Sequence, residues 1–335
     1  MNRSFAEMLH GGPIDLEEVE RVSETLIFER VWRGAKFFKF ACLLVLAASI
    51  ATFGLLGDSV AVIIGAMIVA PLMLPIMGLA FSVSIGDQRK IISTMLVSFA
   101  GIAMAIAVGF ILTLPIAKVT HPEAIQQIMI RTSPHLLDLM AALATGFAGA
   151  FALSRKDVSD TLPGVAIAVS LVPPLANVGI LLALGEPKLA AGSLLLFVTN
   201  YVSILLTGSL VFVVMGFRQV ATSPFDPRAR RRAVTIALIA LIIIVIPLSL
   251  SSYNLIVANK ISARAYTLAQ EWLDGSGYQL LRVDAETADG TVNLLLLGEG
   301  EIPPLSKFQE QAKNLLFGRT IRVKVVESQI MYIDK

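Results

Sequence analysis

Residues 65–87 read GAMIVAPLMLPIMGLAFSVSIGD, an apolar stretch with Pro71 and Pro75 near its middle. Together with the apolar residues before it, the stretch is long enough to cross a bilayer core, which takes about 20 residues of helix. A proline removes a backbone donor and clashes with the preceding helical turn. We therefore expect residues 60–85 to form a membrane span that is kinked or broken.

The composition of the whole chain agrees with a membrane location. Of its 335 residues, 56% are hydrophobic and 16% are charged, and the formal net charge is +2. Soluble domains carry about 25% charged residues, so a soluble enzyme is disfavoured, and a disordered chain would need far lower hydrophobicity. The low net charge gives no indication of nucleic-acid binding. We expect a polytopic α-helical membrane protein whose surface contacts the lipid bilayer.

Six further stretches have the length and hydropathy of membrane spans. The fifth span contains a proline pair, Pro173–Pro174, much as the second contains Pro71 and Pro75. The seven predicted spans cover residues 37–56, 60–85, 91–117, 135–153, 160–184, 189–217 and 233–257.

Lysine and arginine are distributed unevenly over the connecting segments. Fifteen lie in the N-terminal segment and in the loops after spans two, four and six, against three in the alternate loops. Because basic loops stay on the cytoplasmic side, we expect a cytoplasmic N-terminus, an extracytoplasmic C-terminus and a location in the plasma or inner membrane. The basic run 228–232 is interpreted as a topology anchor, with an anionic-lipid or nucleic-acid patch as the alternative.

Charged segments flank the spans and define the predicted domains. Residues 1–36 contain an amphipathic helix, capped by Asp15, that lies on the inner membrane surface or packs against the bundle. Residues 37–217 form a six-helix membrane domain, and residues 218–257 add a basic loop and the seventh span. Residues 258–335 hold 19 of the 52 charged residues. Their pattern predicts a small α-β-β-α-β domain with helices at 259–272 and 304–317 and strands at 278–285, 291–297 and 319–326.

The opening stretch also matches residues 164–186, GVAIAVSLVPPLANVGILLALGE, at an offset of 99 residues. The aligned pairs include Gly65 with Gly164, Ile68 with Ile167, Leu72 with Leu171, Pro75 with Pro174, Gly86 with Gly185, Asp87 with Glu186, and Gly109 with Gly208. Three spans separate the copies, and an odd number reverses direction across the membrane. We therefore predict a 3+3 inverted repeat, a pattern typical of secondary transporters. Chance similarity between apolar runs, with a simple proline kink in each span, is the alternative.

Residues 65–76 have the pattern GAMI-x-x-P-L-M-x-P-I, and VPPLANVGILLALGE follows at 172–186. With these segments the chain resembles the bacterial and archaeal membrane proteins of domain-of-unknown-function family 389. The resemblance covers residues 37–217. It implies a membrane location and carries over no activity, and it does not extend to the C-terminal domain, because many relatives carry other soluble appendages.

Polar residues within spans are candidates for a transport site. Asp138 lies one turn into span four, with His135 on the same face, and is either a proton or cation ligand or an interfacial helix cap. Asn177 follows the proline pair closely enough to reach the broken segment. Thr199 and Asn200 lie in the middle of span six and serve either helix packing or solute binding. The candidate pathway therefore comprises Pro71, Pro75, Pro173, Pro174, Asn177, Thr199, Asn200 and Asp138.

These features favour a secondary transporter or channel-like permease for a small ion or polar solute, which we expect to form homo-oligomers. A membrane sensor or assembly scaffold, whose outer domain binds a partner, is the alternative. The sequence contains no metalloprotease, hydrolase or P-loop motif, and its 3 histidines are scattered. We therefore expect no enzyme activity, no cofactor and no metal site.

Overall fold

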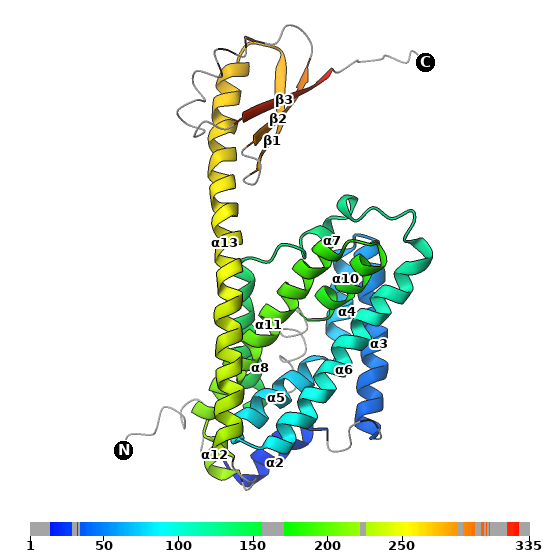
Figure 1. Ribbon diagram of the computed structural model, residues 1–335, viewed down its shortest axis with the longest axis vertical. Coiled ribbons are helices and arrows are strands. Elements are labelled where there is room, and N and C mark those ends of the chain that lie inside the picture. Colours follow the sequence, from blue (N-terminus) through cyan, green and yellow to red (C-terminus); the bar gives the residue numbers. More distant parts are fainter. Residues whose placement is uncertain are drawn as a thin grey trace, which may run out of the picture. The chain divides into compact units, whose positions relative to one another are not determined.

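The computed structural model describes residues 14–28, 32, 34–155, 171–221, 226–286, 291–298, 303, 304, 306, 308 and 320–327. The chain divides into two compact units, Met1–Leu248 and Ser249–Lys335. Within the described residues, 5 helices are long and apolar enough to cross a membrane, and a sixth span results if two helices bent by 49° are taken together. This is the architecture of a helical membrane protein (Figure 1).

The first unit is a helical bundle in which long helices alternate with short ones. Two 3-10 turns, Leu114–Ile116 and Pro122–Ala124, precede α7. The helices are α2 (Leu16–Leu26), α3 (Ala35–Leu56), α4 (Val60–Val69), α5 (Met73–Ile85), α6 (Gln88–Thr113), α7 (Gln126–Met129), α8 (Leu136–Ser154), α10 (Val172–Ala183), α11 (Pro187–Val214), α12 (Phe217–Val220) and the first part of α13 (Pro227–Leu273).

The amphipathic helix α2 packs against the bundle. Asp15 Oδ1 accepts a hydrogen bond from the backbone N–H of Glu18 at 2.9 Å, which is the predicted cap. Val22 and Leu26 are buried in the bundle core, whereas Leu16, on the first turn, is 49% exposed. Helix α2 contacts α5 and α8. Of the two predicted positions, the membrane surface and the bundle, the structure therefore has the helix packed against the bundle.

Span two is broken, as its prolines predict. Helix α4 ends at Val69 and α5 begins at Met73, with a bend of 49° between them. Pro71 has no N–H to donate to the carbonyl of Met67, which a continuous helix would require. The backbone N–H of Leu74 donates to the carbonyl of Pro71 at 3.1 Å and closes the turn. Every residue of α5 from Pro75 onward is buried.

The proline pair of span five opens a helix instead of interrupting one. Pro173 and Pro174 occupy the first turn of α10, where a missing N–H breaks no helical hydrogen bond. Val172 to Leu181 are all buried, and the 12 residues of α10 are too few to span a bilayer alone. The earlier part of predicted span 160–184, including Gly164 and Ile167, lies outside the described residues.

The two half-helices α5 and α10 each pack against both α6 and α11. The latter run in opposite directions (Figure 1). At one end, the N–H of Asp226, which follows α12, donates to the carbonyl of Gly86 at the start of α6. At the other end, Ser193 Oγ, near the start of α11, donates to the carbonyl of Arg131, which lies in the segment after α6. Consequently α5 and α10 occupy opposite ends of the bundle.

Span seven and the first helix of the predicted C-terminal domain form one continuous helix. Helix α13 has 47 residues, whereas the sequence predicts a span over 233–257 and a separate helix over 259–272. Neither glycine nor proline occurs between residues 248 and 274, so nothing in the local sequence ends the helix. The boundary between the two compact units, after Leu248, falls within it.

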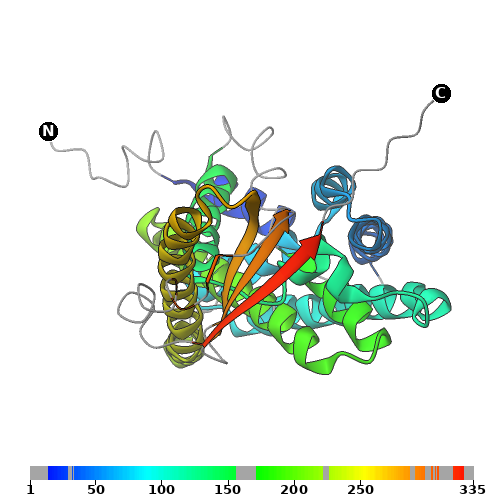
Figure 2. The same cartoon turned by 90° about the horizontal axis from the view of Figure 1, so that it is seen from above.

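A three-stranded sheet packs against the last part of α13 (Figure 2). Strands β1 (Tyr278–Glu286), β2 (Thr291–Gly298) and β3 (Thr320–Glu327) agree with the predicted strands to within one residue at each end. β2 is central, antiparallel to β1 and parallel to β3. The ring of Trp272 in α13 packs against that of Phe308, with centroids 5.0 Å apart and the planes tilted by 38°. Most of the predicted helix 304–317 lies outside the described residues.

Candidate functional site

The candidate prolines stand at the starts of the two half-helices, toward the middle of the bundle. Helix α5 ends at Ile85, shortly before the start of α6, and α10 ends at Ala183, shortly before the start of α11. Since α6 and α11 are antiparallel, the C-terminal ends of α5 and α10 point to opposite ends of the bundle. Their N-terminal ends therefore both point toward its centre, as the predicted midplane site requires.

The prolines also have a structural role at these N-termini. Neither N-cap residue, Leu72 or Leu171, has a side-chain cap. The first N–H groups of a helix have no partner within it, and unpaired donors are costly where water is absent. Pro75, Pro173 and Pro174 remove such donors. On the α4 side of the break, the polar backbone groups are the last carbonyl oxygens of the helix, beginning with that of Met67.

Asn177 is fully buried and connects α10 to the loop of residues 114–135, which includes α7. Its Nδ2 donates to the carbonyl of Ile128 at 3.1 Å and to Ser193 Oγ at 2.7 Å. The hydroxyl of Ser193 donates in turn to the carbonyl of Arg131 at 3.1 Å. Both Asn177 donor bonds thus go to α11 and the loop, and not to the broken segment that the sequence suggested. Within the described part of the chain, Asn177 Oδ1 has no hydrogen-bond partner.

The loop that Asn177 holds is fixed from a second side by Asp58, which lies just after the end of α3. The backbone N–H of Gln127, in α7, donates to Asp58 Oδ1 at 2.7 Å. Arg131 Nη1 donates to Gln127 Oε1 at 3.0 Å, and burial lowers the pKa of the Arg131 guanidinium from its ordinary value. Asp58 thus binds the N-terminal turn of α7, although the two are 69 residues apart in the sequence. No local sequence pattern could have predicted this contact.

Thr199 and Asn200 are both buried in α11. Thr199 Oγ1 donates to the carbonyl of Leu195 at 2.7 Å, one turn earlier in the same helix. This is the usual way in which threonine satisfies its hydroxyl inside a helix. Thr199 therefore has a partner within its own helix, and Asn200, which is 3% exposed, is the larger of the two buried polar side chains.

Asp138 lies at the start of α8 and forms the interfacial cap. The backbone N–H of His135 donates to Asp138 Oδ2 at 2.7 Å, which closes the first turn. The His135 Nδ1 atom is 3.8 Å from the same oxygen, and both side chains are partly exposed, at 31% and 42%. Of the two roles that the sequence left open for Asp138, the geometry is that of the helix cap.

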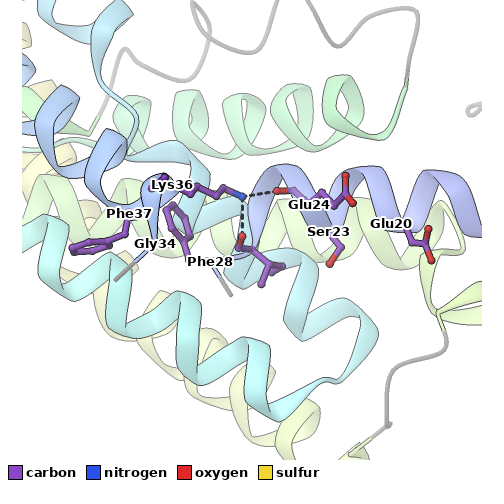
Figure 3. Close-up of a pocket in the computed structure, with 9 residues that line it drawn as sticks. Glu20, Ser23, Glu24, Phe28, Gly34, Lys36 and Phe37 are labelled. Atoms are coloured by element: carbon purple, nitrogen blue, oxygen red, sulfur yellow. Dashed lines mark hydrogen bonds between the residues drawn. The ribbon is translucent and has the colours of Figure 1, made fainter. Parts of the chain in front are cut away.

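A pocket of about 520 Å³ lies between α2 and the start of α3 (Figure 3). Lys36 Nζ donates to the carbonyls of Glu24 and Ile27, at 2.5 and 2.8 Å, and lies 5.0 Å from the centroid of the Phe28 ring. A lysine at the C-terminal carbonyls of a helix stabilises that end, so the pocket belongs to the attachment of α2. No group of three or more metal-ligating side chains occurs among the residues that the structure describes.

A bundle of apolar helices with two buried half-helices defines a polytopic membrane protein. Residues 67–206 match the model of the family described as domain of unknown function (DUF389). An uncharacterised protein of Methanocaldococcus jannaschii is 29% identical over 211 residues, which are 61% of this chain and 64% of that protein. The chain thus spans less than two thirds of that relative. Both matches confirm the resemblance predicted from residues 65–76: residues 67–206 are similar to the domain of family 389, and this region includes α5 and α10.

Proposed function

We propose that this protein is a secondary transporter or channel-like permease for a small ion or polar solute, built from two inverted repeats of three spans. The observation that carries the proposal is the pair of buried half-helices, α5 and α10, whose N-termini point toward the centre of the bundle. Matched interruptions in two inverted repeats are where secondary transporters bind their solutes. Neither enzyme chemistry nor a cofactor is part of the proposal, and assembly with further copies of the chain is compatible with it.

Helix boundaries support a repeat at the offset of 99 residues found in the sequence. Helix α5 begins at Met73 and α10 at Val172, while α6 begins at Gln88 and α11 at Pro187. Each pair is separated by 99 residues, since 172 − 73 and 187 − 88 both equal 99. Chance similarity of apolar residues would not place four helix starts in this relation.

The ends of the half-helices repeat as well. Gly86 and Gly185 both adopt positive φ, at 74° and 80°, which glycine tolerates best. The next N–H donates to an equivalent carbonyl in each copy. These bonds join Asp87 to Ser82 at 3.2 Å and Glu186 to Leu181 at 2.9 Å.

Contacts between the copies are exchanged in the way that a two-fold relation requires. Gly109 of α6 lies against the backbone of Ala176 in α10. The position 99 residues after Gly109 is Gly208 in α11, and the position 99 residues before Ala176 is Met77 in α5. Gly208 lies against Met77. A two-fold rotation that superposes the repeats would therefore place the Gly109–Ala176 contact on the Gly208–Met77 contact.

The same relation assigns a place to Asn200. Gly101 of α6 packs against the break in span two, where an added Cβ would lie 2.9 Å from Leu72 Cδ1. Adding 99 to both positions gives Asn200 and Leu171, the N-cap residue of α10. We infer that the Asn200 amide lies at the second break, where the first repeat has only a glycine. Together with the freed carbonyls of α4, it supplies polar groups for a solute.

Flux measurements test the proposal. The full-length protein, reconstituted in proteoliposomes, is expected to conduct at least one member of a panel of inorganic anions, inorganic cations and small polar metabolites. Pro71→Ala supplies a donor for the carbonyl of Met67 and lets span two straighten, so flux should fall by about tenfold or more. Asn200→Ala should reduce flux while the protein remains folded.

Pro115→Ala is the matched control, because Pro115 is exposed in the 3-10 turn after α6 and should leave flux unchanged. Equal flux in the wild type, Pro71→Ala and Asn200→Ala would remove the breaks from the pathway. If the folded protein conducts nothing in the panel, the second candidate function gains support: a membrane sensor or scaffold that uses its compact second unit, Ser249–Lys335, to bind a partner.

A further inference from the structure

A groove of about 520 Å³ lies between α6 and the first part of α13, with α5 and α11 forming its floor. Most of its wall is apolar, including Ile92, Met95 and Phe99 of α6 and Leu205 of α11. One end differs: Gln88, Asp226, Arg228 and Arg232 line it. The groove is therefore amphipathic along its length, with two arginines against one carboxylate at its polar end.

The polar end lies where both bordering helices begin. The candidate span of α6 begins at Gln88 and that of α13 at Arg230. The N–H of Asp226 donates to the carbonyl of Gly86 at 2.9 Å, which holds the two starts together. The groove thus runs from the end of both spans, at the depth of lipid headgroups, into the hydrocarbon region.

Arg228 and Arg232 are exposed. Their neighbour Asp226 directs a carboxylate oxygen to its own helix, since Oδ1 accepts from the backbone N–H of Arg228 at 2.9 Å. Because both arginine side chains are exposed, their guanidinium groups can receive an external anion. A guanidinium can donate two parallel hydrogen bonds to two oxygens of one phosphate group. Arginine therefore binds a phosphate ester better than it binds a monatomic anion.

We propose that this groove binds an anionic phospholipid, with its phosphate between Arg228 and Arg232 and an acyl chain along α6 and α13. The volume lies in the range of ligand pockets, about 300–1,000 Å³. Basic pockets between transmembrane helices on the cytoplasmic side suit anionic headgroups. A zwitterionic lipid fills the apolar part equally well but has a net charge of zero opposite the arginines. The proposal does not depend on transport.

Lipid binding to the full-length protein tests this proposal. In a neutral detergent, dioleoyl phosphatidylglycerol should raise the unfolding temperature of the wild type more than dioleoyl phosphatidylcholine does, and should be retained through purification. In the double variant Arg228→Gln/Arg232→Gln, the affinity for phosphatidylglycerol should fall roughly fivefold for each arginine removed. Ile92→Trp, which fills the apolar part, should weaken binding of both lipids.

Arg231→Gln is the matched control, because Arg231 belongs to the same basic run, is exposed and does not line the groove. It should bind phosphatidylglycerol like the wild type. An equal loss in Arg231→Gln would mean diffuse attraction to the basic run and would overturn the proposal. So would equal effects of the two lipids on the wild type, or a stabilisation of the same size by inorganic phosphate alone.

Discussion

Gly109 allows α6 and α10 to pack with their backbones in contact. An added Cβ at this position would overlap the carbonyl of Ala176. Small residues at helix contacts are a general requirement inside membranes, where lipid tails are as apolar as leucine and close packing holds helices together. Gly65 in α4 is a contrasting case, because nothing lies within 4 Å of an added Cβ there.

Gly109→Ala should therefore destabilise the protein by about 1–3 kcal/mol, the usual cost of overpacking. Gly65→Ala should be neutral or stabilise α4 by up to about 1 kcal/mol, because alanine is the better helix former. Thermal unfolding of both variants in the same detergent measures the difference. Equal unfolding temperatures for the two variants would show that α6 and α10 do not approach as described.

Buried polar residues were identifiable from the sequence, but their partners were not. Asn177 and Thr199 are both buried, as expected for polar groups inside spans. Their uses differ because Thr199 bonds one turn back in its own helix, whereas Asn177 bonds residues 128 and 193, which only the fold brings near. Local spacing reveals the first kind of bond and cannot reveal the second.

At the scale of elements, the exposure of its side chains shows which face of the amphipathic helix α2 packs against the bundle. Val22 is 1% exposed against the bundle, whereas Leu16 on the first turn is 49% exposed. The contact is reinforced by polar bonds, including Arg21 Nη2 to the carbonyl of Leu153 at 3.1 Å and Lys90 Nζ to Ser23 Oγ at 3.1 Å. The helix is thus attached to both α8 and α6.

Val22→Asp should cost several kcal/mol, because it places a charge in the core without a partner. Leu16→Asp should change stability by no more than about 0.5 kcal/mol, as exposed substitutions usually do. Thermal unfolding, with limited proteolysis of the N-terminal segment, distinguishes them. A similar cost for both substitutions would mean that α2 uses its Leu16 face against the membrane surface.

Proline positions made the broken span predictable, whereas no proline or glycine lies near residue 258, where the sequence analysis divided α13. Pro71 and Pro75 stand four residues apart within one apolar run, where the span breaks, whereas the single Pro247 leaves α13 continuous. The predicted division of α13 near residue 258 rested on a change from apolar to charged composition. Composition marks where a helix changes its surroundings, but a helix ends only where its backbone bonding is interrupted or capped.

For the whole molecule, the central claim is that two copies of a three-span unit face opposite sides of the membrane. Helix boundaries, positive-φ glycines and exchanged contacts all follow the offset of 99 residues. Among the described residues, five full spans and one broken span correspond to six of the predicted seven, and of predicted span 160–184 only the part from residue 171 onward, which contains α10, is described. The inverted arrangement is a proposal that the sequence already suggested, because Pro and Gly positions repeat at this offset.

The sidedness of two equivalent positions tests the claim most directly. Arg89 and Lys188 are both exposed, 99 residues apart, just after the starts of α6 and α11. In a chain whose single cysteine is replaced by Cys42→Ala, Arg89→Cys and Lys188→Cys are each treated with a membrane-impermeant maleimide on intact cells. Lys188→Cys should react from outside, and Arg89→Cys only after permeabilisation. Reaction of both cysteines from the same side would contradict the inverted repeat.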